Sequence, residues 1–143
     1  MKLSLKWGSI FGLAAFVINL IIPGCIEPFV AFVAAFAAGA QTVRQSMASG
    51  KATAIRLGVY AGLVSGLIII ITDLFTSIIL AAVYLNKEKL PWLTLPENPY
   101  FQPTAVNIIL FTTLVFLCMG AMKILFTLAG GISGAVVFRR KTE

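Results

Sequence analysis

The sequence predicts an all-α integral membrane protein, with four transmembrane helices in an antiparallel bundle made of a short first hairpin and two long helices. Two observations lead to this prediction. Apolar residues make up 59% of the 143 residues and charged residues only 11%, whereas about half of a soluble domain is apolar. The apolar residues also fall into four stretches, 7–22, 28–43, 54–85 and 104–138, and the mean hydropathy is +1.00. We therefore expect residues 1–143 to form a single transmembrane domain.

The first two stretches are expected to form the short hairpin. Each corresponds to about 24 Å of helix, slightly less than the hydrocarbon core of about 30 Å. Pro23 and Gly24 break the helix between them, and Pro28 suits the first turn of the second helix. The N-terminal segment resembles a signal peptide. Because Pro23 stands where such a cleavage site has a small or aliphatic residue, we expect a retained helix.

The third and fourth stretches are longer than a bilayer requires. A polar link over 44–53 precedes the third, and a proline-rich outer loop over 86–103 separates the two. As straight helices they would measure about 42 and 50 Å. Their apolar ends, 77–85 and 105–117, should project past the hairpin, and exposed apolar surface of that size is typical of a partner site. The alternative is a break in the fourth helix between Gly120 and Lys123.

The basic residues predict the orientation. Four crossings place eight of them on one side of the membrane and only Lys87 and Lys89 on the other. The positive-inside rule then places both termini in the cytoplasm of a multi-pass protein, and we expect a bacterial or archaeal inner or plasma membrane. Because these charges flank apolar runs, the net charge of +6 does not indicate a nucleic-acid partner. The eight residues are Lys2, Lys6, Arg44, Lys51, Arg56, Arg139, Arg140 and Lys141.

Four aromatic residues near the outer loop are expected at the outer headgroup level, as interface aromatics usually are. The alternative is a ligand-binding aromatic cluster. These residues are Tyr84, Trp92, Tyr100 and Phe101.

Small residues recur about every four positions in each apolar stretch. Such a spacing lines one face of a helix and lets a neighbouring backbone approach closely, so we predict tight packing in the cytoplasmic half. A glycine-lined pore is the functional alternative. The predicted packing residues are Gly8, Gly12, Ala35, Gly39, Gly58, Gly62, Gly66, Gly130 and Gly134.

Three ionisable residues interrupt the apolar stretches, namely Glu27, Asp73 and Lys123. Counted from the cytoplasmic helix ends, they lie about 24, 24 and 22 Å along their helices. They should therefore meet at one level toward the outer leaflet, where Lys123 can pair with either carboxylate. A structural ion pair or snorkelling toward the interface is the simplest explanation. The alternatives are an ion or proton site and a contact with a charged group of another subunit.

The sequence indicates neither catalysis nor a cofactor. There is no histidine, and Cys25 and Cys118 are too few for a metal site and lack a CxxC spacing. We expect them to be small buried apolar residues, with a disulfide between them as the alternative. No nucleophile–base pair or metal-ligand set stands out, so we expect no enzyme, no metal and no cofactor.

These observations favour a non-catalytic small subunit or helix-packing scaffold of a larger membrane protein complex. Its expected partners are the lipid bilayer and other membrane subunits or further copies of the chain. The alternative is a small homo-oligomeric transporter or channel that uses Glu27, Asp73 and Lys123. The chain is similar to small multidrug transporters only in length and helix count, and the membrane-embedded glutamate of their first helix has no counterpart here.

Overall fold

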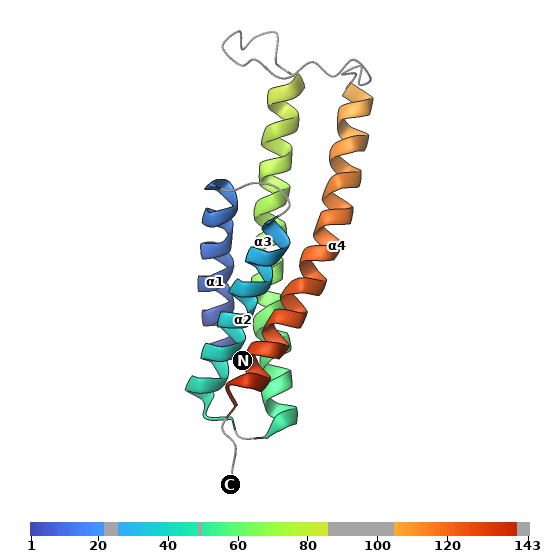
Figure 1. The fold of residues 1–143 in the computed structure, drawn as a ribbon. Coiled ribbons are helices and arrows are strands. Elements are labelled where there is room, and N and C mark those ends of the chain that lie inside the picture. The colour runs from blue at the N-terminus through green and yellow to red at the C-terminus, as the bar shows by residue number, and fades with distance from the viewer. Residues whose placement is uncertain (22–25, 49, 86–104, 140–143) are drawn as a thin grey trace.

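The computed structural model describes residues 1–21, 26–48, 50–85 and 105–139, and in these ranges it contains four helices and no strand. The helices are α1 (Lys2–Ile21), α2 (Glu27–Ser46), α3 (Lys51–Leu85) and α4 (Ala105–Val137). The predicted all-α class is thus confirmed. Figure 1 shows the two long helices, α3 and α4, rising well past the end of the α1/α2 pair.

The helices extend further into polar sequence than predicted. α1 begins at Lys2, five residues before the expected start at position 7. The predicted link over 44–53 is largely helical, because α2 continues to Ser46 and α3 begins at Lys51. Met47, with a left-handed φ of 52°, ends α2. Hydropathy marks the apolar part of a helix and not its ends, since Lys, Arg, Gln and Ser are acceptable helix residues in water.

The α4 helix is continuous from Ala105 to Val137, so the alternative of a break between Gly120 and Lys123 is wrong. Within the described ranges, two helices are long and apolar enough to cross a membrane, judged by length and composition. They are α3 over Lys51–Ile79 and α4 over Phe116–Val137. A membrane crossing by α1 and α2 stays a prediction.

The core of the bundle is built from small residues. Ala15 of α1, Ala31 and Ala34 of α2, and Ile69 of α3 form one buried cluster. A second cluster, nearer the ends of α2 and α4, contains Val43, Ala48, Ala54 and Ala135. Large apolar side chains point outward instead, for example Leu13, Phe29 and Leu67, which are more than half exposed. This distribution is typical of helices that pack tightly together within an apolar solvent.

One end of the bundle brings all four helices together. Ser4 of α1 donates a hydrogen bond to the Leu57 carbonyl of α3 over 3.4 Å. The indole of Trp7 donates to the Gln45 side chain of α2 over 3.0 Å. The start of α1, the end of α2, the start of α3 and the end of α4 lie at this end (Figure 1).

Candidate functional site

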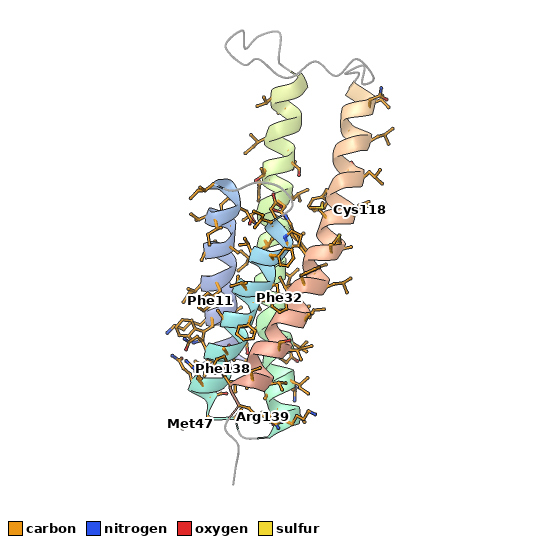
Figure 2. All side chains as sticks on the ribbon, in the orientation of Figure 1. Phe11, Phe32, Met47, Cys118, Phe138 and Arg139 are labelled. Carbon is orange, nitrogen blue, oxygen red and sulfur yellow. The ribbon has the colours of Figure 1, made fainter. Side chains whose placement is uncertain are left out.

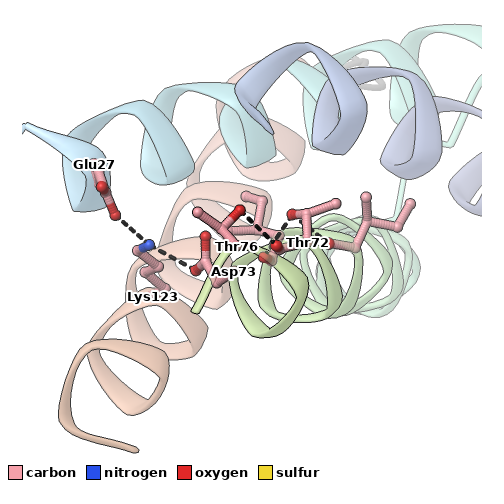
Figure 3. Close-up of polar contacts among 7 residues, drawn as sticks. Glu27, Thr72, Asp73, Thr76 and Lys123 are labelled. Atoms are coloured by element: carbon pink, nitrogen blue, oxygen red, sulfur yellow. Dashed lines mark hydrogen bonds and ion pairs between the residues drawn. The ribbon is translucent and has the colours of Figure 1, made fainter. Parts of the chain in front are cut away.

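Lys123 lies between the two carboxylates that the sequence places at its level. Its Nζ is 2.6 Å from Asp73 Oδ2 on α3 and forms a second ion pair with Glu27 Oε2 at the start of α2. Figure 3 shows the ammonium group between the two carboxylates, with the three residues coming from three helices. The Lys123 side chain is 3% exposed, whereas Glu27 and Asp73 are 21% and 23% exposed.

The cluster fixes the relative heights of three helices. Glu27 is the first residue of α2, Asp73 lies beyond the middle of α3, and Lys123 lies near the middle of α4. A buried ammonium group that has two carboxylate partners is satisfied only when all three helices keep their register. The three side chains neutralise one another's charge, and they include no nucleophile with an adjacent base.

Two threonines on the adjoining turns of α3 turn their hydroxyl groups back to their own helix. Thr72 Oγ1 donates to the Ile68 and Ile69 carbonyls at 2.9 and 2.7 Å, and Thr76 Oγ1 donates to the Thr72 carbonyl at 3.0 Å. These bonds satisfy the hydroxyl groups within α3 (Figure 3). The threonine hydroxyl groups therefore do not extend the ion-pair cluster.

Asn19 of α1 is a polar residue at the same level that the sequence analysis missed. Ala15 and Ile69 belong to the same buried cluster. Gly8 lies against Val64 and Gly12 against Ile68, so four residues along α1 correspond to four residues along α3. Asn19, four residues after Ala15, is therefore level with Asp73, four residues after Ile69. Asn19 is 9% exposed, and neither atom of its amide has a hydrogen-bond partner in the described structure. The available signal was Asn19 itself, a polar residue on the face of α1 that also contains Gly8, Gly12 and Ala15.

Glycines bring α4 into backbone contact with two helices at once. A Cβ added at Gly130 or Gly134 would collide with the carbonyl oxygens of Phe32 and Phe36 on α2. A Cβ at the adjacent Gly131 would collide with the Gly58 carbonyl oxygen of α3. The sequence analysis missed Gly131, because it follows Gly130 directly and breaks the four-residue spacing. Two consecutive glycines are what a helix needs to approach one neighbour on each side.

The other predicted packing residues also lie at helix contacts. A Cβ at Gly62 would be 2.5 Å from the Thr127 carbonyl oxygen, and one at Gly66 would be 2.6 Å from Thr127 Oγ1. Gly8 and Gly12 of α1 face α3, and the contacts of a Cβ there would begin at 2.8 and 3.2 Å. Gly39 meets the Gly131 carbonyl, Gly58 also meets the Ala135 side chain, and Ala35 is completely buried. The structure thus places every predicted small residue inside the bundle.

Of the other candidate residues, the structure describes only the side chain of Cys118. Cys118 is exposed and free, which contradicts its expected burial; Figure 2 labels it on α4. Cys25, Trp92, Tyr100 and Phe101 lie outside the described residues, as does the side chain of Tyr84. Among the residues that the structure describes, no group of three or more His, Cys, Asp or Glu could hold a metal ion.

Comparison of the chain with protein-family models, with curated proteins and with solved structures finds no match.

Proposed function

We propose that the chain is a non-catalytic integral membrane subunit, or a helix-packing scaffold, of a larger membrane protein complex. The observation that carries this proposal is the apolar surface on the projecting ends of α3 and α4. The charged cluster supports it in a second way, because Lys123 and its two partners already satisfy one another and act as a structural lock on helix register.

The helix lengths explain why these ends require a partner. α1 and α2 have 20 residues each, whereas α3 and α4 have 35 and 33. These numbers correspond to about 30 Å for the short helices and about 50 Å for the long ones. A bilayer has a hydrocarbon core of about 30 Å and measures about 40–45 Å with its headgroups. A bilayer that fits the hairpin leaves the ends of α3 and α4 beyond its core, and a tilt of about 20° changes this little.

Those ends carry large apolar side chains that no helix of the bundle covers. Seven of them are between 55% and 65% exposed. Outside the hydrocarbon, this much apolar surface favours burial against another protein. The seven residues are Ile78 and Ile79 of α3 and Val106, Ile109, Leu110, Leu114 and Leu117 of α4.

The proposed topology has four antiparallel crossings with both termini in the cytoplasm. The order of the α3/α4 contacts supports antiparallel packing of these two helices. Gly58 contacts Ala135, whereas Gly62, which comes later in α3, contacts Thr127, which comes earlier in α4. The described basic residues other than Lys123 all lie near the end where α1 begins and α4 ends. A basic end of this kind is typical of the cytoplasmic side.

The second candidate is a small homo-oligomeric transporter or channel that uses Glu27, Asp73 and Lys123. The observation that favours it is the exposure of the two carboxylates, each about one fifth accessible although the ammonium group is buried. An ionisable group within a membrane that remains partly accessible is often on an ion or proton path.

Site-specific photo-cross-linking in native membranes tests the proposal. A photoreactive residue at Ile78 or Leu114 should cross-link to a different membrane protein, which mass spectrometry of the purified adduct identifies. The matched controls are Leu13 and Val33, which are equally exposed on the short hairpin and should react mainly with lipid. Adducts formed only with further copies of this chain would favour the oligomeric transporter. Equal reaction with lipid at all four positions would contradict a partner at the projecting ends.

A further inference from the structure

An apolar groove with a volume of about 510 Å³ lies between α1 and α2. The described residues that line it are all apolar. Ala15 and Ala34 are buried at its bottom, whereas Phe29 and Val33 at its rim are more than half exposed. Binding sites for small ligands are commonly apolar hollows of about 300–1,000 Å³. The groove is therefore large enough to hold a ligand.

The described glycines of α1 and α2 bring these helices close to other helices and not to each other. Gly8 and Gly12 of α1 lie against α3, and Gly39 of α2 lies against α4. Where α1 and α2 face each other, Ala14 and Ala37 line the groove and leave its space unfilled. The atoms around an unfilled space lose dispersion contacts, so a ligand that fills the groove would restore them.

The groove covers one half of the α1/α2 hairpin. It begins at Ile18 and Ile26, near the end where α1 stops and α2 starts. Its described lining stops at Phe11 and Ala37, which lie at the midpoints of α1 and α2. From Ile26 to Ala37 the groove is about 16 Å long, and one leaflet of the hydrocarbon core is about 15 Å thick. In the proposed topology the groove therefore spans the outer leaflet.

Contacts near the cytoplasmic end connect α1 to α2 beyond the groove. The ring of Phe11 lies 5.9 Å from the ring of Trp7, measured between centroids. The Trp7 indole donates a hydrogen bond to the Gln45 side chain of α2 over 3.0 Å. A helix of another protein that crosses both leaflets would find no groove over this half of the hairpin. The groove thus fits a ligand that occupies a single leaflet.

We propose that this groove binds one acyl chain of a phospholipid in the outer leaflet. An acyl chain is apolar and has the length of one leaflet. Because it is flexible, it can follow a surface made of small and large side chains, and dispersion contacts then stabilise it in the groove. Packing contacts of this kind drive association within a bilayer, where the surroundings are already apolar. The site goes beyond the proposed subunit role and rests only on membrane insertion in the proposed orientation.

Photoreactive phospholipids test the site in vesicles that contain the full chain. Phosphatidylcholine with a diazirine in one acyl chain is activated, and mass spectrometry maps the adducts. Val30 lines the groove and is only partly exposed, whereas Leu67 of α3 and Leu125 of α4 lie outside it and are more than half exposed. A bound acyl chain should label Val30 several-fold more than either leucine. Val30 labelling no stronger than that of the leucines would overturn the site.

The position of the diazirine along the acyl chain tests the orientation of the ligand. A diazirine near the headgroup should label Ile18 and Ile26, at the outer end of the groove. A diazirine near the terminal methyl group should label Phe11 and Ala37, at its inner end. The reverse order would overturn a ligand from the outer leaflet.

Filling the groove provides the matched comparison. Ala14→Leu/Ala37→Leu adds side-chain volume to the lining and should abolish the preference for Val30. Ala121→Leu/Ala129→Leu adds the same volume at exposed positions of α4 and should keep it. Equal labelling of Val30 in the two double variants would overturn the site. If the filled variant does not fold, the comparison of Val30 with the two leucines in the wild type decides the question.

Two further measurements distinguish other occupants and separate the two proposals. A photoreactive side chain at Val30 should attach to lipid, and attachment to protein instead would overturn the site. Release of the chain from membranes by carbonate extraction would contradict membrane insertion, and with it both the proposed function and the groove site. A retained chain without the preference for Val30 would overturn the groove site alone.

Discussion

Removing the Lys123 ammonium group should destabilise the protein strongly. Lys123→Met keeps most of the apolar volume but leaves Glu27 and Asp73 without their shared partner. Breaking a buried ion pair by removing one partner costs about 3–5 kcal/mol. Because about one fifth of each carboxylate side chain is exposed, water can solvate part of the released charge. We therefore expect a loss at the low end of that range, about 3 kcal/mol.

The assay is thermal unfolding in dodecyl maltoside micelles, followed by circular dichroism. For a chain of this size, about 3 kcal/mol corresponds to a fall in Tm of roughly 10 °C. The triple variant Glu27→Gln/Asp73→Asn/Lys123→Met removes both charges that the single variant leaves behind, and it should recover most of the loss. Glu27→Gln alone keeps the pair with Asp73 and should cost about 1 kcal/mol. A triple variant as unstable as Lys123→Met, or a Lys123→Met protein as stable as the wild type, would refute this reasoning.

Three further outcomes are expected. Gly134→Ala should cost about 1–3 kcal/mol of stability and lower Tm, because the added Cβ would collide with the Phe36 backbone. The control Gly120→Ala adds a Cβ with nothing within 4 Å and should raise Tm slightly through helix propensity. Equal Tm values for the two variants would contradict the packing. Asn19→Leu should stabilise by about 1 kcal/mol, since it removes an unpaired buried amide; a lower Tm would show that the amide has a partner. In intact cells of a cysteine-free background, an impermeant thiol reagent should label Asn98→Cys and not Lys2→Cys, and labelling of both would exclude a cytoplasmic N-terminus.

The sequence was most informative about position along the helix axes. Three residue counts placed Glu27, Asp73 and Lys123 at one level because an α-helix rises by a constant amount per residue. The sequence was less informative about helix ends, as at Lys2, because apolar patterning indicates an apolar environment and not the backbone conformation. The partner of a buried side chain was harder still. The surroundings of Asn19 and Gly131 depend on which face of each helix contacts which neighbouring helix. Those contacts follow from the packing of all four helices together.

The same ion-pair cluster makes the last helix of the chain a condition for the stability of the earlier ones. Helices leave the ribosome in sequence order, so Glu27 and Asp73 are made long before Lys123. In the proposed topology, a chain without α4 has two carboxylates that lack the Lys123 ammonium group, and the glycine faces of α2 and α3 lack the α4 backbone against which they pack. The contacts that stabilise α2 and α3 are therefore completed only when the last helix of the chain has been made.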